Sequence, residues 1–111
     1  MTITWGKSRE ISFDGPHEIT SWNPPYRAAV YVIMIPGDKE GYYKLIYVGE
    51  SSNLSERGFY KSHHAYGCWI KQVGSGSNLF IGIHQMLNST QEERTKIEQQ
   101  LISDYNPSCN D

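Results

Sequence analysis

The chain lacks any apolar run long enough to cross a membrane. Its longest apolar stretch covers residues 28–35, whereas a membrane-spanning helix needs about 20 apolar residues. The first residues also lack the positively charged start and apolar centre of a secretory signal peptide. We therefore expect a non-secreted, cytoplasmic protein that does not contact a membrane.

The chain also lacks an excess of basic residues. It has 10 Lys and Arg against 12 Asp and Glu, a formal net charge of -2. Proteins that bind DNA without a sequence preference use positive charge against the phosphates, and the binding weakens as salt rises. The charge balance counts against a stand-alone, high-affinity DNA-binding protein. We expect any DNA binding to be weak and strongly salt-dependent.

Cysteine is scarce. Only Cys68 and Cys109 occur, and they form no C-x-x-C pair. In a chain without a secretory signal, two distant cysteines are more often reduced thiols than a disulfide, so we expect reduced thiols. His63, His64 and Cys68 could be considered as zinc ligands, but their spacing fits no standard ligand pattern.

The length of 111 residues allows one domain, which we divide into an N-terminal extension, 1–27, and a main domain, 28–111. Apolar and polar residues alternate in 3–5 and 11–13, which predicts a small hairpin. The extension could pad the core or reach a partner. Padding is favoured because Trp5, Phe13 and Trp22 need burial.

The sequence pattern of the main domain predicts three strands and several helices. Residues 28–35 predict a buried central strand, residues 42–48 its antiparallel neighbour across a short polar loop, and residues 79–86 a third strand. Helices are predicted from residue 53, around 69–73 and after Thr90, which forms a capping box with Glu93. The last helix is predicted to end at Asn106-Pro107. The predicted class is α/β of the α+β type, with a small three-stranded antiparallel sheet flanked by helices.

The segment from Tyr47 to Arg57 has the composition of a strand, a sharp turn at Gly49 and a helix capped by Asn53. This arrangement brings Tyr47 and Arg57 to one edge of the sheet. Tyr31, on the neighbouring strand, can share a face with Tyr47. Two such tyrosines are by default an ordinary cross-strand pair. A phenol beside a fixed cation could instead handle a phosphate and a water.

Two acids stand out. Glu98 lies at the border of the apolar face of the last helix, whereas Glu92 and Glu93 are explained by capping and the helix dipole. Glu98 could be a solvated residue, a partner for an arginine or a metal ligand. Glu50 follows Gly49 directly, where an acid would repel DNA or help to hold a metal.

Together these motifs resemble the GIY-YIG nuclease family over about residues 28–110. The resemblance is carried by Ala29-Val30-Tyr31, Tyr47-Val48-Gly49, Asn53-Leu54, Arg57, Glu98 and Asn106-Pro107. Domains of this family have a small three-stranded antiparallel sheet flanked by helices. The family includes homing endonucleases, restriction enzymes and repair nucleases that hydrolyse DNA phosphodiesters with a divalent metal.

The resemblance implies a role for each matching residue. Tyr31 and Tyr47 would be the paired tyrosines, with Tyr31 the first choice and Tyr47 the second as base for the attacking water. Glu98 would be the single carboxylate ligand of Mg²⁺ or Mn²⁺. Arg57 would bind the phosphate, and Asn106 would support the site from behind the helix. His63 would join them, with His64 and Tyr60 as competitors; the remaining substrate contacts would come from Gly49, Asn53 and Lys61.

Three interpretations follow. The chain is an endonuclease that acts on DNA, alone, as a homodimer or with a targeting protein partner. Alternatively, it is an inactive nuclease-like module that binds nucleic acid or a protein, since fold does not fix function. In the third, it is an unrelated small globular protein whose tyrosines belong to the core.

Overall fold

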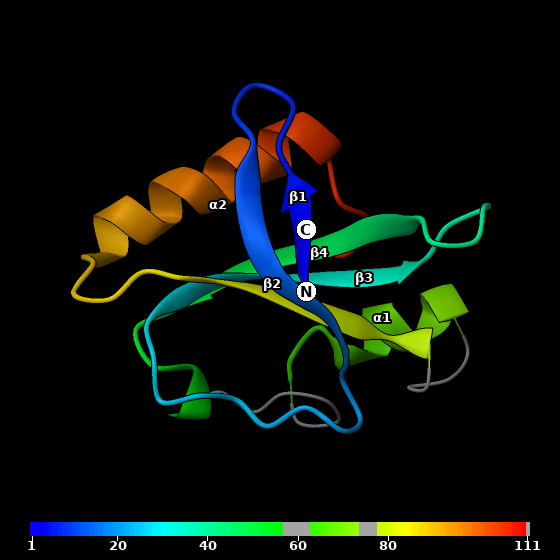
Figure 1. Ribbon diagram of the computed structural model, residues 1–111, viewed down its shortest axis with the longest axis horizontal. Helices are drawn as coiled ribbons and strands as arrows, with labels where there is room; N and C mark the ends of the chain where they lie inside the picture. The colour runs from blue at the N-terminus through cyan, green and yellow to red at the C-terminus, as the bar shows by residue number, and fades with distance from the viewer. Residues whose placement is uncertain (57–62, 74–77, 111) are drawn as a thin grey trace.

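The computed structural model describes residues 1–56, 63–73 and 78–110. These residues form a curled, five-stranded antiparallel sheet with the strand order β1-β2-β5-β3-β4 (Figure 1). The described helices are a short 3-10 helix, Leu54–Glu56, and two α-helices, α1 (Tyr66–Val73) and α2 (Gln91–Tyr105). None of them is long and apolar enough to span a membrane.

Strand β3 (Ala29–Pro36) is buried and has a neighbouring strand on each side, as predicted. It pairs with β4 (Tyr43–Ser51) on one side and with β5 (Phe80–Gln85) on the other. All its residues except Pro36 are buried. A strand covered on both faces needs apolar side chains in both directions, which explains its unbroken apolar sequence.

The predicted three-stranded sheet is wrong, because the first residues add two strands to it. Strands β1 (Thr2–Trp5) and β2 (Ile11–Glu18) form the predicted hairpin, and β2 then pairs with β5, for example through Asp14 and Ile83. The physical reason is that β5 would otherwise be an unpaired edge. The hairpin also buries Ile11 and Phe13 under the sheet, so it contributes to the core.

The two α-helices cover opposite faces of the sheet (Figure 1). On one face, Tyr31, Ile33 and Tyr47 pack with Trp69 of α1. On the other face, Val30, Val32 and Val48 pack with Leu101 of α2 and with the hairpin. The alternation of side chains along β3 and β4 therefore separates two cores.

Helix α2 begins and ends where the sequence predicts. The Thr90 side chain accepts a hydrogen bond from the N–H of Glu93, and the Glu93 carboxylate accepts one from the N–H of Thr90. Asn106 ends the helix in the left-handed conformation, with φ 45° and ψ 60°. This conformation is common after a helix and is tolerated by asparagine.

The tip of the hairpin rests on the last turn of α2. The N–H of Gly6 donates to Tyr105 Oη at 2.7 Å, and the N–H groups of Lys7 and Ser8 donate to the Asp104 carboxylate at 3.0 and 3.3 Å. The hydrogen bond from the Lys7 N–H is the main cause that lowers the pKa of Asp104 below its ordinary value of 3.8, with further help from Ser8 and Gln100. These contacts fix the hairpin to the helix end.

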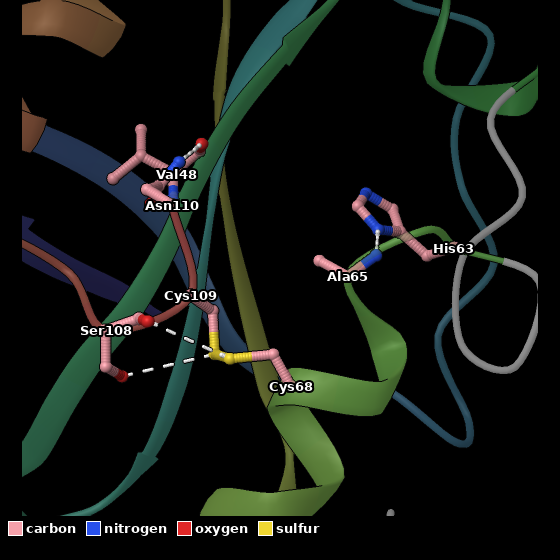
Figure 2. The surroundings of a disulfide bond; sticks show 7 residues. All are labelled: Val48, His63, Ala65, Cys68, Ser108, Cys109 and Asn110. Atoms are coloured by element: carbon pink, nitrogen blue, oxygen red, sulfur yellow. Dashed lines mark hydrogen bonds between the residues drawn. A yellow bond between two sulfur atoms is a disulfide. The ribbon is translucent and has the colours of Figure 1, made fainter.

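The expectation of two reduced thiols is wrong. Cys68 in α1 and Cys109 after α2 form a disulfide, with their Cα atoms 5.7 Å apart (Figure 2). Their distance along the chain concealed this pairing, because only the folded chain brings α1 beside the C-terminal segment. A disulfide sulfur has no thiolate to offer, so Cys68 cannot join the two histidines around a zinc ion in this state.

Candidate functional site

The two tyrosines lie on one face of the sheet, as predicted. Tyr31 is opposite Gly49 in the β3–β4 register, and Tyr47 is opposite Ile33. The tyrosines are therefore diagonal neighbours, and their ring centroids are 6.1 Å apart. Both rings are buried, on the side of the sheet that α1 covers.

Gly49 leaves the space that the Tyr31 ring occupies. A Cβ built on Gly49 would lie 2.5 Å from Tyr31 Oη and 2.8 Å from Cε1, closer than real Cβ contacts allow. The hydroxyl end of the Tyr31 ring thus lies directly over β4 at Gly49. Gly49 was predicted to contact substrate; in the described structure its visible effect is to admit this ring.

His63 connects the tyrosines to α1. It is buried, and its Nε2 lies 2.8 Å from Tyr31 Oη. The N–H of Ala65 donates to His63 Nδ1 at 3.0 Å, so a neutral imidazole must carry its proton on Nε2 (Figure 2). Nε2 then donates to the Tyr31 hydroxyl. His63 was the first choice among the histidines, and the structure brings it to Tyr31.

His64, the competitor of His63, is brought to Tyr47 instead. Its Nε2 lies 3.4 Å from Tyr47 Oη, and the side chain is exposed. Tyr47 and His64 line one side of a pocket of about 320 Å³, at the lower end of the roughly 300–1,000 Å³ typical of ligand pockets. The other lining residues are Ala65, Cys68, Ser108, Cys109 and Asn110.

Asn110 is the residue that sequence reasoning missed. Its Oδ1 accepts from the N–H of Val48 and its Nδ2 donates to the Val48 carbonyl, both at 2.8 Å (Figure 2). The N–H of Cys109 adds a bond to the Ile46 carbonyl at 2.9 Å. The C-terminal segment therefore covers the outer edge of β4 beside Tyr47 and Gly49.

Asn106, which was predicted to support the site, is exposed at the end of α2. Its position before Pro107 is explained by the left-handed helix end alone. Asn110 has no such local explanation. This difference is the only signal in the sequence that could have pointed to Asn110 instead of Asn106 as the supporting residue. Asn110, rather than Asn106, holds the strand that carries Tyr47.

Two of the four predicted substrate-binding residues, Arg57 and Lys61, lie outside the described residues, and so does Tyr60, the other competitor of His63. Asn53 is described and acts as the predicted cap, because its Oδ1 accepts from the Ser55 N–H at 3.1 Å and from the Ser55 hydroxyl at 2.7 Å.

Glu50 is paired with a buried arginine. Arg94 Nε donates to Glu50 Oε1 at 2.9 Å, while its Nη1 donates to the Ser89 carbonyl and hydroxyl at 2.8 Å each. Glu50 lies opposite Val30 in the register and so points toward the α2 side. A buried arginine needs such a partner, which accounts for an acid directly after Gly49.

Glu98 comes from the opposite side of the sheet to the tyrosines. It is half-buried on α2, one turn after Arg94 and one turn before Ile102, and α2 packs on the face opposite Tyr31 and Tyr47. Since β4 is the outermost strand, Glu98 could meet the tyrosines only around its edge.

A single half-buried carboxylate suits a hard cation that keeps most of its waters and takes further oxygens from phosphate. Among the described residues no group of three or more His, Cys, Asp or Glu side chains could hold a metal. The donor chemistry of Glu98 fits Mg²⁺ or Mn²⁺ bound together with substrate.

Comparison with protein-family models, curated proteins and solved structures finds no match to this chain. The resemblance to GIY-YIG nucleases thus depends on the motifs of the sequence, and the activity it implies is a proposal.

Proposed function

We propose that this protein is a divalent-metal-dependent endonuclease that hydrolyses DNA phosphodiester bonds. The observation that supports this best is the grouping of Tyr31, Tyr47, His63 and His64, of which Tyr47 and His64 line a pocket. Two hydroxyls and two imidazoles at one end of a sheet are groups that can orient a water and move a proton. Two tyrosines that only pack in a core would not need the imidazoles of His63 and His64 beside their hydroxyls.

The geometry favours Tyr47 over Tyr31 as the residue that meets the attacking water. Tyr47 lines the pocket, whereas Tyr31 is fully buried and accepts a hydrogen bond from His63. Tyr31 and His63 would then hold the position of Tyr47 and Gly49. This reverses the order of preference expected from the sequence.

Glu98 would hold Mg²⁺ or Mn²⁺, which stabilises negative charge on the leaving oxygen when it is bound. Arg57 would place its guanidinium on the phosphate oxygens. Because the net charge is -2, DNA binding should be weak and should fall steeply with salt. One site cuts one strand, so a double-strand break would require a homodimer, sequential nicks or a targeting partner.

The test is nicking of supercoiled plasmid and of single-stranded, flapped and branched oligonucleotides in low salt with Mg²⁺ or Mn²⁺. Cleavage should stop with chelator and should fall at least roughly 100-fold in Glu98→Gln and Arg57→Ala, the loss typical of removing one stabilising group. Glu92→Gln is the matched control, because Glu92 is an exposed acid in the first turn of the same helix.

The second candidate is an inactive module that binds nucleic acid or a protein partner. The placement of α2 favours it, because the helix that carries Glu98 packs on the face of the sheet opposite the tyrosines. A folded wild-type protein that cuts none of these substrates, and whose DNA affinity is unchanged in Glu98→Gln, would replace the first proposal with the second.

A further inference from the structure

A column of three aromatic rings runs from the core of the protein to its surface. Trp69 lies 4.4 Å from His63, and His63 lies 4.5 Å from His64, measured between ring centroids. The ring planes are 35° and 25° apart, so both contacts are close to stacking. Two rings cannot occupy the same face of an imidazole at such distances. His63 is therefore held between Trp69 and His64.

The column ends in an exposed ring. Trp69 and His63 are buried, whereas His64 is exposed. The inner face of His64 is covered by His63, so its outer face is the one left to solvent. An exposed ring held from behind by two buried rings is fixed in orientation before any ligand arrives, which lowers the entropic cost of stacking on it.

Tyr47 lies along the side of this column. Its ring is nearly perpendicular to those of His63 and His64, at 5.3 and 6.1 Å between centroids, and its hydroxyl reaches His64 Nε2. Tyr47 and His64 also line the 320 Å³ pocket. A planar group stacked on His64 would therefore have its attached atoms beside the Tyr47 hydroxyl.

We propose that the outer face of His64 is a stacking platform for an unpaired nucleobase, so that the substrate is DNA with a single-stranded or branched segment. This inference depends on the proposed nuclease function and names its substrate class. In a duplex both faces of each base are covered, and exposing one requires flipping the nucleotide out. A base that is already unpaired can stack on His64 without that cost, and its phosphodiester then lies next to Tyr47.

The test measures binding in chelator, where nothing is cut. The probe is a short single-stranded oligonucleotide carrying one 2-aminopurine, compared with the same sequence as a duplex. Stacking of one base on a protein ring is worth roughly 5- to 150-fold in affinity. His64→Ala should weaken single-strand binding at least about five-fold and reduce 2-aminopurine quenching, with no change for the duplex.

Two variants keep the test specific. His64→Phe retains a ring while losing the bond to Tyr47, so it should restore single-strand binding and quenching. His17→Ala, a histidine substitution on β2 where His17 pairs with Asp14, should change nothing. Equal losses for single strand and duplex, or a His64→Phe protein as weak as His64→Ala, would overturn the platform.

Parallel cleavage assays with Mg²⁺ separate this inference from the proposed function. A protein that quenches 2-aminopurine through His64 but cuts no DNA would retain the platform and reject the nuclease. A protein that nicks duplex plasmid equally well in wild type and His64→Ala, without preferring unpaired DNA, would retain the nuclease and reject the platform.

Discussion

Single atoms decide the geometry around Tyr47. The Tyr31 ring can lie over β4 only because residue 49 has no Cβ, and the backbone of Val48 is held by one side-chain amide. Both features act on the strand that carries Tyr47. Substitution of Gly49 or Asn110 should therefore lower the stability of the protein and, under the nuclease proposal, its cleavage activity.

Gly49→Ala should lower the free energy of unfolding by roughly 1–3 kcal/mol, because the added methyl overlaps the buried Tyr31 ring. Urea denaturation measures this loss. Gly67→Ala is the control: apart from its chain neighbours and the backbone of its own helix, no atom of the described residues lies within 4 Å of its added Cβ. Alanine also favours a helix, so that protein should be unchanged or up to about 1 kcal/mol more stable. If Gly49→Ala and Gly67→Ala changed the free energy of unfolding equally, the Tyr31 ring would have to be able to move away from the added methyl group.

Asn110→Ala should cost about 1–2 kcal/mol, because the N–H and C=O of Val48 lose their partners at the outer edge of the sheet. The midpoint of urea unfolding is the readout. In contrast, Asn106→Gly should have little effect, since glycine suits the left-handed helix end. A larger loss at position 106 than at 110 would reverse the roles that the structure gives to the two asparagines.

At the scale of whole elements, the hairpin and α2 support each other. Asp104 accepts hydrogen bonds from the hairpin tip, Tyr105 Oη accepts another, and the Trp5 ring meets the Tyr105 ring edge-on at 5.3 Å. The hairpin thus depends on α2 for its tip and on β5 for its pairing. The hairpin lies in the segment that the sequence predicts to be an N-terminal extension. In the fold it is fixed by α2 at its tip and by β5 along β2.

The contribution of Asp104 should depend on pH. Its pKa in the folded protein is lowered, chiefly by the Lys7 N–H, so the folded state favours the carboxylate more than the unfolded state does. The stabilisation is complete above the ordinary value of 3.8 and is lost as the pH falls through the lower folded pKa. Asp104→Asn should therefore melt below wild type at pH 7, with the gap narrowing near pH 3. A gap that widens in acid would contradict this account.

At the scale of the whole molecule, the disulfide joins α1 to the segment that covers β4. It closes the wall of the pocket that Tyr47 and His64 line. The two cysteines are separated by 41 residues, and closing a loop of that length in the unfolded chain corresponds to about 4 kcal/mol.

Reducing the protein, or replacing both cysteines by serine, should lower the free energy of unfolding by about 4 kcal/mol. Urea denaturation with and without reductant measures the loss, and the double serine variant should no longer respond to reductant. An unfolding midpoint that is the same in both conditions would mean that the bond adds nothing to the folded state.

The disulfide also bears on the predicted cytoplasmic location. The cytosol keeps most thiols reduced, so a cytoplasmic protein should yield free Cys68 and Cys109 when cells are quenched in acid and labelled with a thiol reagent. Recovery of the oxidised form from cells would favour an oxidising compartment instead.

Much of the architecture was predictable because it depends on local patterns. The unbroken apolar run of β3, the short polar loop to β4 and the capping box at Thr90 each specify an element through nearby residues. The pairing of Tyr31 and Tyr47 on one face followed from strand alternation. The pairing of the hairpin with β5, the disulfide and the role of Asn110 were not predictable, since each joins residues far apart in the chain.

The sequence by itself determined strands β3, β4 and β5, the limits of α2 and the residue types on which the proposed site is built. Periodicity, turn residues and caps act over a few residues, so they can be read along the chain. Only the tertiary structure decided that the first residues complete the sheet, that Asn110 holds β4, and that His63 and His64 stack beside Tyr47. Those outcomes depend on which distant surfaces bury each other, and that is set by the packing of the whole chain.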